Sequence, residues 1–125
     1  MCAEMLTPRS GNVTLSGMAT DAFTVEYLEL INGSRPFVEW VTAMTDVEAR
    51  AIILRRIARL RGGNFGNCKS VSTDIRELRI DYGPGYRVYF AMRSRTIAVV
   101  LCAGTKKTQL NDIRNAQKLW ETYTR

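Results

Sequence analysis

The sequence predicts an α+β fold, in which a small, mostly antiparallel sheet is covered by an N-terminal helical hairpin and a C-terminal helix. Three observations lead to this class. Residues 77–90 alternate apolar and polar side chains on both sides of a Gly-Pro-Gly sequence, which is typical of an antiparallel β-hairpin. Residues 36–61 and 108–123 carry apolar side chains at helical spacing. The expected order of elements is β, α, α, β, β, β, α, within one domain.

The hairpin at residues 77–90 is the most sharply patterned part of the chain. Gly83-Pro84-Gly85 provides the conformational freedom and the fixed φ that a tight reversal needs. Apolar side chains alternate with polar ones along both strands, so we expect one buried face and one face exposed to solvent. The exposed face is expected to carry Arg79, Arg87 and Tyr89.

The chain before the hairpin is expected to begin with an extension and one strand. Residues 1–23 are rich in Gly, Ser and Thr and are interpreted as a poorly ordered extension, with the folded domain at residues 24–125. A first strand is expected at residues 24–31. Pro36 then begins a helix, at a position where a missing N–H does no harm. Its apolar stripe is formed by Phe37, Trp40, Val41 and Met44.

A second helix is expected to start near residue 45 and to end at Gly62. Thr45 and Glu48 have the spacing of a capping box. The expected core face of this helix consists of Ile53, Leu54, Ile57 and Leu60. Its cationic side chains fall largely off that face and are Arg55, Arg56, Arg59 and Arg61. Residues 62–74 are then expected to form a loop.

A strand and a helix are expected to complete the fold. Residues 96–102 are apolar on both faces and predict a central strand that is covered on both sides. Thr108 is expected to cap the last helix, whose apolar stripe is Leu110, Ile113, Ala116, Trp120 and Tyr123.

Charge is distributed unevenly along the chain. Residues 1–48 hold seven acidic and two basic side chains, a net charge of −5, whereas residues 49–125 hold five acidic and 16 basic side chains, a net charge of +11. A basic body of this kind indicates a polyanionic partner, either a nucleic acid or an acidic protein.

The composition also excludes some classes of chemistry. The chain has no histidine, so it contains no His-based catalytic arrangement. Cys2, Cys68 and Cys102 lack the paired spacing of a zinc site, so neither a metal nor another cofactor is expected. No segment predicts a membrane span or a secretory signal, and we therefore expect a cytoplasmic protein without a membrane partner.

Three segments carry a resemblance to a known family. They are Gly63-Asn64-Phe65-Gly66-Asn67-Cys68-Lys69-Ser70-Val71, the hairpin at 77–90, and Leu101-Cys102-Ala103-Gly104-Thr105-Lys106-Lys107-Thr108-Gln109 followed by Asp112-Ile113 and Ala116. In this order and spacing, the chain resembles the RelE/ParE superfamily of type II toxins, and in particular its phage-derived, HigB-like "addiction module killer protein" branch. The hairpin is the most specific of the three segments.

The resemblance implies a RelE-like fold and a toxin that forms an oligomer with a cognate helix-turn-helix antitoxin. For many relatives it also implies metal-independent endonuclease cleavage of mRNA on the ribosome, which inhibits translation. Other members of the superfamily inhibit DNA gyrase and cleave nothing, and an inactive binding remnant is a third alternative. Sequence reasoning leaves these three open.

The residues that suit RNA cleavage are cationic or phenolic. Guanidinium groups at Arg79 and Arg87 match the oxygens of a phosphorane, Lys69 adds positive charge, and Tyr89 can stack on a base or donate a proton. These four are the candidate catalytic residues. The candidate RNA-binding residues are Arg55, Arg59, Lys106, Lys107 and Gln109. The alternative for the hairpin arginines is a structural ion pair with Glu77 or Asp81. No residue of the set is an obvious base at neutral pH.

Overall fold

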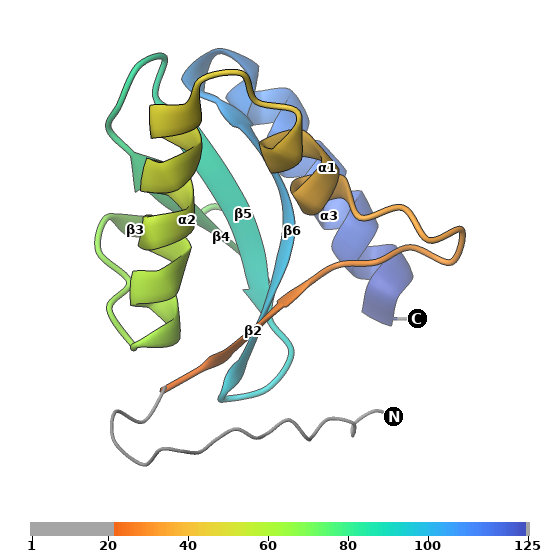
Figure 1. Ribbon diagram of the computed structural model, residues 1–125. Helices are drawn as coiled ribbons and strands as arrows, with labels where there is room; N and C mark the ends of the chain where they lie inside the picture. Colours follow the sequence, from red (N-terminus) through yellow and green to blue (C-terminus); the bar gives the residue numbers. More distant parts are fainter. Residues whose placement is uncertain (1–21, 125) are drawn as a thin grey trace.

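The computed structural model describes residues 22–124, which form a three-layered α+β domain (Figure 1). Its helices and strands, in chain order, are β2 (Thr24–Tyr27), α1 (Pro36–Thr42), α2 (Val47–Arg61), β3 (Cys68–Ser70), β4 (Ile75–Ile80), β5 (Tyr86–Met92), β6 (Ile97–Thr105), the 3₁₀ turn η2 (Lys106–Thr108) and α3 (Gln109–Thr124). The mixed fold predicted from sequence is confirmed. The expected extension at residues 1–23 lies almost wholly outside the described residues.

The five strands of the described domain form one sheet in the order β2-β6-β5-β4-β3. Only the pairing of β2 with β6 is parallel, and the other three pairings are antiparallel. The sheet is therefore mostly antiparallel, as the sequence predicts. The strand β3 was missed, because three residues in a Gly- and Asn-rich segment show no alternation. This strand forms one edge of the sheet beside β4.

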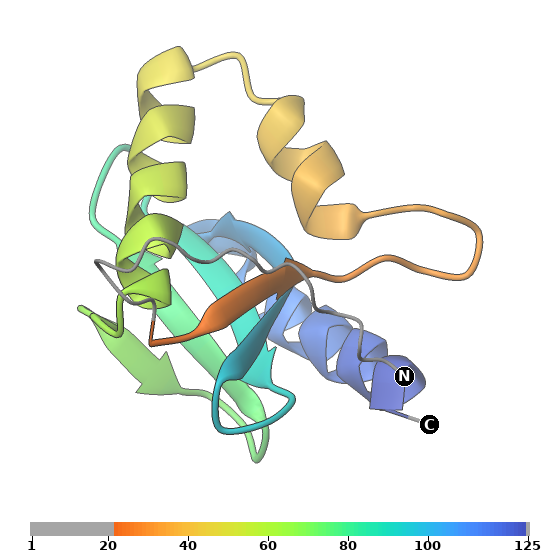
Figure 2. The ribbon, with the colours of Figure 1, turned by 60° about the horizontal axis from the view of Figure 1, so that its bottom comes forward.

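The helices α1 and α2 lie on one side of the sheet and α3 on the other (Figure 2). Two separate apolar clusters hold these layers together, one on each face of the sheet. The first lies beneath α1 and α2 and centres on Phe37, Ile53, Ile57, Leu78, Val88, Phe90 and Val100. The second lies beneath α3 and includes Ile75, Tyr89, Ala91, Val99, Leu101 and Ala116. Because β5 and β6 contribute to both clusters, the prediction of a central strand covered on both sides is confirmed for β6.

Both N-terminal helices form close to where the sequence places them. Pro36 occupies the first turn of α1, and α2 ends at Arg61 with Gly62 after it. The predicted capping box of α2 is wrong, because Asp46 is the N-cap residue and its side chain accepts a hydrogen bond of 3.0 Å from the backbone N–H of Ala49. Asp46, one residue after the predicted cap Thr45, thus provides an acceptor for the free backbone N–H groups at the start of α2.

Some residues assigned to apolar helix faces lie on the surface. Leu54 on α2 is 42% exposed, and Leu110 on α3 is 73% exposed. Conversely Arg56, expected off the core face of α2, is only 6% exposed. Its guanidinium lies beneath Gly66, where a Cβ atom would approach it to 2.6 Å, and donates to the Asn67 carbonyl at 3.1 Å. The loop between α2 and β3 closes over this side chain, an arrangement that helical periodicity does not indicate.

The strand and helix boundaries at the C-terminal end also differ from expectation. β6 extends to Thr105, three residues beyond the predicted strand. The helical backbone then begins with η2, for which Thr105 is the N-cap residue, so the capping role expected for Thr108 belongs to Thr105 together with Thr108. None of the helices described at residues 22–124 is both long enough and apolar enough to cross a membrane.

Candidate functional site

The hairpin formed by β4 and β5 places the predicted site residues on one face of the sheet. Arg79 is paired directly with Arg87, and Glu77 with Tyr89. Cross-strand partners share a face, so these four side chains all point to the side on which α3 lies. The prediction that this face is exposed to solvent is wrong, because Glu77 and Tyr89 are each 0% exposed. Period-two alternation cannot indicate that a distant helix covers the polar face.

Glu77 is the centre of a hydrogen-bond network beneath the start of α3. Its Oε1 accepts from Arg79 Nε at 2.9 Å. Its Oε2 accepts from the Tyr89 hydroxyl at 3.0 Å and from Gln109 Nε2 at 2.8 Å. Three donors, one of them cationic, compensate the cost of burying this carboxylate. The network joins β4, β5 and the first residue of α3.

These contacts set the protonation states of the two buried groups. Burial by itself raises the pKa of Glu77, but the hydrogen bonds from Arg79, Gln109 and Tyr89 outweigh it and hold the pKa below its ordinary value. Burial, together with the adjacent Glu77 charge, raises the pKa of Tyr89 far above its ordinary value. Glu77 is therefore ionised and Tyr89 protonated at neutral pH.

Tyr89 occupies a different environment from the one its proposed role requires. Its ring is fully buried in the cluster beneath α3, and its hydroxyl donates to Glu77. A base that stacks on a ring needs an open ring face. In this arrangement Tyr89 contributes to the site by holding the Glu77 carboxylate.

Arg87 is a buried cation of the site without a carboxylate partner among the described residues. It is 9% exposed, and its buried Nε atom has no hydrogen-bond partner in the part of the chain that the structure describes. It makes no salt bridge within 4.0 Å among these residues, whereas Arg79 pairs with Glu77. A buried N–H without an acceptor costs free energy, which an anion bound at this guanidinium would offset.

The turn between β4 and β5 brings a further cation next to Arg87. Gly85 has a φ of 81°, and a Cβ atom built there would lie 3.4 Å from the Cβ of Lys106 and 4.0 Å from Nη1 of Arg87. The N–H of Lys106 donates to the Gly85 carbonyl at 2.7 Å. The turn thus lies between Lys106 and Arg87, while the adjacent Lys107 is exposed.

Gly104 fixes the position at which α3 begins. It is paired with Arg87 across β5 and β6. A Cβ atom at this position would collide with the Asp112 carboxylate and would approach the Thr108 hydroxyl to 2.8 Å. Only a residue without a side chain lets the first turn of α3 lie this close to the sheet. This close approach brings Gln109 within reach of Glu77.

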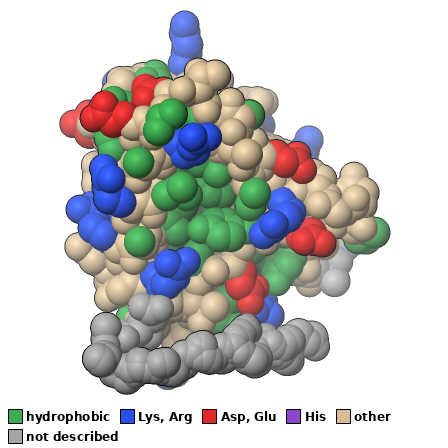
Figure 3. All heavy atoms as spheres, viewed as in Figure 1, with side chains coloured by type: hydrophobic (Ala, Val, Ile, Leu, Met, Phe, Trp, Pro, Cys, Tyr) green, Lys and Arg blue, Asp and Glu red, His purple; other side chains and the backbone are tan. Residues whose placement is uncertain are grey.

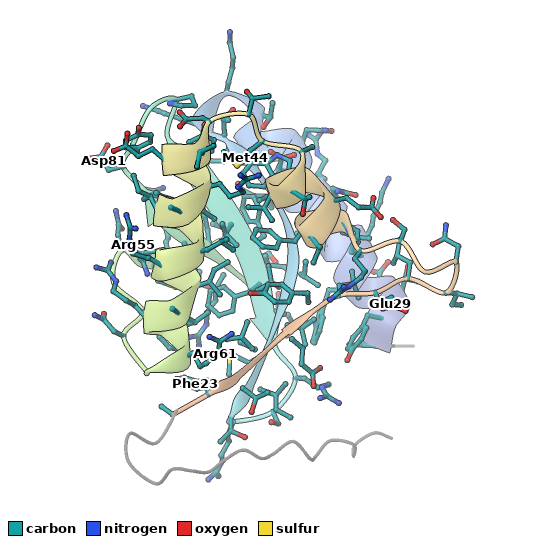
Figure 4. All side chains as sticks on the ribbon, in the orientation of Figure 1. Phe23, Glu29, Met44, Arg55, Arg61 and Asp81 are labelled. Carbon is teal, nitrogen blue, oxygen red and sulfur yellow. The ribbon has the colours of Figure 1, made fainter. Side chains whose placement is uncertain are left out.

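The remaining predicted residues divide between the two faces. Lys69 on β3 is the cross-strand partner of Glu77 and is exposed, so it lies at the edge of the same face. Arg55 and Arg59 are exposed on α2, which covers the opposite face. In Figure 4 the labelled Arg55 points outward from α2, away from the sheet. The structure therefore brings Lys69, Arg79, Arg87, Lys106 and Gln109 together and leaves the α2 arginines separate.

Glu77 is the residue that sequence reasoning missed as part of the site. It was considered only as a structural partner for the arginines, and its ion pair with Arg79 is present. Its position in the sequence could have indicated this role, because it is the acid two residues before Arg79 on the same face of β4. The other acid considered, Asp81, is exposed and makes no salt bridge with either arginine among the described residues.

The described residues form two hollows, and both lie away from Arg79 and Arg87. One hollow of about 410 Å³ is bordered by Phe65, Cys68 and Arg76, and another of about 520 Å³ lies between α3 and the loop before β4. Neither is lined by Arg79 or Arg87. Within residues 22–124 there is no group of three or more Cys, Asp or Glu side chains arranged to hold a metal ion. Arg79 and Arg87 therefore lie outside both hollows, beside the start of α3.

The fold and this site define a small α+β protein with a cationic face built around a buried carboxylate. Residues 39–121 match the family described as "Phage derived protein Gp49-like (DUF891)". A relative from Haemophilus influenzae (strain ATCC 51907 / DSM 11121 / KW20 / Rd), described as "Uncharacterized protein", is 46% identical over 83 residues, which cover 66% of this chain and 84% of the relative. The chain belongs to the Gp49-like family. This is a family of addiction-module killer, RelE-like toxins, and membership implies an antitoxin partner.

Proposed function

We propose that this protein is the toxin of a type II toxin–antitoxin module and acts as a metal-independent, ribosome-dependent mRNA endonuclease of the HigB-like branch. In this proposal α1 and α2 correspond to the N-terminal helical hairpin of the RelE-like fold. The observation that carries the proposal is the Arg79–Arg87 pair. Two guanidinium groups lie directly opposite each other, and only one of them has a carboxylate partner among the described residues.

The roles of the residues follow from this geometry. Like charges directly opposite each other in a sheet are destabilising, so a bound phosphate would relieve the repulsion between Arg79 and Arg87. The same guanidinium groups would stabilise the charge that develops on a phosphorane. Lys69, at the edge of this face, is the exposed cation nearest to Glu77 in register and would serve in proton transfer. Lys106, Lys107 and Gln109 would contact the RNA beside the turn.

A direct test compares two double substitutions in growing cells. Expression of Arg79→Ala plus Arg87→Ala is expected to abolish growth arrest and mRNA cleavage, because the phosphate contacts are lost. Arg95→Ala plus Lys118→Ala is the charge-matched control, since it also removes two positive charges, from exposed positions outside the hairpin. We expect the control to arrest growth like the unmodified protein. Undiminished mRNA cleavage by the Arg79/Arg87 variant would exclude the proposed role of the pair.

One observation favours a second candidate function, inhibition of DNA gyrase without catalysis. The two titratable hairpin groups nearest to the arginines are both engaged, since Glu77 accepts three hydrogen bonds and Tyr89 is buried. A protein that only binds needs no general base. A supercoiling assay with purified gyrase separates the two functions: loss of supercoiling without RNA cleavage would support the binding function.

We also propose that the partner is a helix-turn-helix antitoxin whose acidic, amphipathic segment lies across α1 and α2. Figure 3 shows an apolar patch on this face with Lys and Arg side chains around it. Partly buried aromatic side chains on this side include Tyr27, Trp40, Phe65 and Tyr86. The exposed Arg55 and Arg59 lie on α2, one of the two helices on this side of the sheet. The rim of the patch also includes Asp and Glu side chains, and its Lys and Arg side chains would suit an amphipathic segment with acidic flanks. Ribosomal RNA is the alternative partner for these arginines.

A further inference from the structure

We infer that Glu77 is a positioning residue, which orients the Arg79 guanidinium toward a phosphate rather than taking part in proton transfer. This inference rests on the proposed phosphate contact of Arg79 and Arg87. It assigns a role to the only acidic side chain that is fully buried among the described residues.

The contact between Glu77 and Arg79 involves one side of the guanidinium. Arg79 Nε donates to Glu77 Oε1 at 2.9 Å. A guanidinium has five N–H donors in a rigid plane, so four of them, all on the two Nη atoms, are left for another acceptor. The Arg79 side chain is 31% exposed, whereas that of Glu77 is 0% exposed. The plane is therefore anchored on its buried side, and its outer donors are accessible to an anion.

Glu77 can act as an anchor because it is itself held in place. Oε2 accepts from the hydroxyl of Tyr89 on β5 and from the amide of Gln109 on α3. These donors come from two different elements, so a rotation of the carboxylate would leave buried polar groups without partners. Its orientation is consequently set by both β5 and α3, and it transmits that orientation to Arg79.

The same contacts make Glu77 unsuitable as a base. Its two oxygens are engaged by three donors, and no part of the residue is accessible to solvent. The hydrogen bonds also hold its pKa below the ordinary value. A base has to reach the proton that it removes. Glu77 therefore acts through Arg79 and does not touch the substrate.

Because Glu77 is negatively charged, its substitution changes the affinity for a polyanion in a direction that tests the inference. Glu77→Gln removes a negative charge next to the proposed anion site, so charge alone predicts tighter binding of a polyanion. Loss of orientation predicts weaker binding, because Arg79 would no longer be held at an angle that suits a phosphate. The two interpretations thus predict changes in opposite directions.

The test measures binding of a fluorescent single-stranded oligodeoxynucleotide, which lacks the 2′-hydroxyl and is not cleaved. Anisotropy titrations at one fixed ionic strength compare the full chain with Glu77→Gln, Arg79→Ala, Arg87→Ala and the Glu77→Gln/Arg79→Ala double variant. We expect Glu77→Gln to weaken binding roughly tenfold, within the range of coupling for residues in contact. In the Arg79→Ala background, the same substitution is expected to cause no further loss.

Tyr89→Phe provides a second variant that keeps every charge. It removes one of the donors that hold the carboxylate and is expected to weaken binding in the same direction as Glu77→Gln, by a smaller factor. Circular dichroism of each variant checks that the fold is retained.

The outcomes distinguish the inference from the function on which it rests. Tighter binding by Glu77→Gln, or an equal loss with and without Arg79, would overturn the positioning role. If Arg79→Ala and Arg87→Ala bind as well as the unmodified chain, the phosphate contact itself is refuted and the positioning role falls with it. Weaker binding by both arginine variants, together with tighter binding by Glu77→Gln, refutes the positioning role alone.

Discussion

The two faces of the central sheet are both covered by helices, yet they are built in different ways. Beneath α1 and α2 the contacts with the sheet are mainly apolar, with Leu78, Val88 and Phe90 each 0% exposed. The exception is Arg56 on α2, which is buried beneath Gly66. Beneath α3 the covered face has apolar contacts at one end and the Glu77 network at the other. Neighbouring residues of the same two strands supply both faces.

The difference separates a face held by non-directional contacts from a face held by directional ones. Apolar contacts are non-directional and stabilise in proportion to the area buried. A buried carboxylate stabilises little net, but it leaves few alternative arrangements for its partners because each donor must be satisfied. The network therefore constrains the orientation of Arg79 and the start of α3, while the opposite face is stabilised mainly by apolar burial. Substitutions on the two faces should separate these contributions.

The largest effect on stability is expected for Phe90→Ala on the apolar face. This substitution removes a fully buried ring and leaves a cavity, which typically costs roughly 3–5 kcal/mol. Leu110→Ala is the control, because this leucine also belongs to an apolar pattern in the sequence but is 73% exposed. Urea unfolding measures both, and a similar loss for the two variants would contradict the described packing.

A smaller effect is expected for Tyr89→Phe on the polar face. The ring remains, and only the hydrogen bond to the ionised Glu77 is lost, which costs about 1.5–3 kcal/mol for a bond to a charged group. Tyr123→Phe serves as the control, since its hydroxyl has no hydrogen bond to the described residues. Equal free energies of unfolding for Tyr89→Phe and the unmodified chain would show that the network is not formed.

Gly104→Ala is expected to destabilise the protein by about 1–3 kcal/mol, because the new methyl group collides with Asp112 and Thr108 and displaces the start of α3. Gly62→Ala is the matched control. A Cβ at Gly62 would meet only the Arg59 carbonyl oxygen, at an ordinary 3.5 Å, and the φ there is −79°. Thermal unfolding of both variants provides the comparison, and an unchanged midpoint for Gly104→Ala would contradict the close approach.

A smaller change in the free energy of unfolding is expected when the pH is lowered, because a single carboxylate, that of Glu77, accounts for it. The pKa of Glu77 is lower in the folded state than its ordinary value, so the folded protein binds its proton less readily than the unfolded chain does. The corresponding stabilisation is present above the ordinary pKa of Glu, about 4.3, and is lost as the pH falls through the lower folded value. Between pH 7 and pH 3, the free energy of unfolding should decrease more steeply for the unmodified chain than for Glu77→Gln. Parallel curves would contradict this linkage.

The smallest effect on stability is expected for Arg55→Ala plus Arg59→Ala, within about 0.5 kcal/mol, because both side chains are exposed. Arg56→Ala provides the contrast on the same helix. Its side chain is 94% buried beneath Gly66, so its removal also loses packing. Urea unfolding should therefore rank Arg56→Ala as the more damaging change. The reverse order would show that the loop does not cover this arginine.

The sequence predicted the class of fold and most of its elements because these depend on local patterns. Alternation in 77–90 identifies the hairpin, and Pro36 and Gly62 mark the beginning of α1 and the end of α2. It missed β3, whose three residues are too few to show a period. Among the site residues, a register symmetric about Gly83-Pro84-Gly85 predicts that Arg79 and Arg87 share a face, and they do. Their direct pairing reflects a register centred on Gly83, one residue earlier than that symmetry implies.

The sequence by itself thus determined which side chains share a face, because a strand alternates with a period of two whatever lies above it. Only the tertiary structure decided which of these faces are buried from solvent. The close contact at Gly104 brings α3 down over the polar side of the hairpin, and this burial changes Glu77 from a surface acid into the anchor of the network. Burial depends on elements distant in the chain, so the environment of Glu77, Tyr89 and Arg87 could not be read from their immediate neighbours.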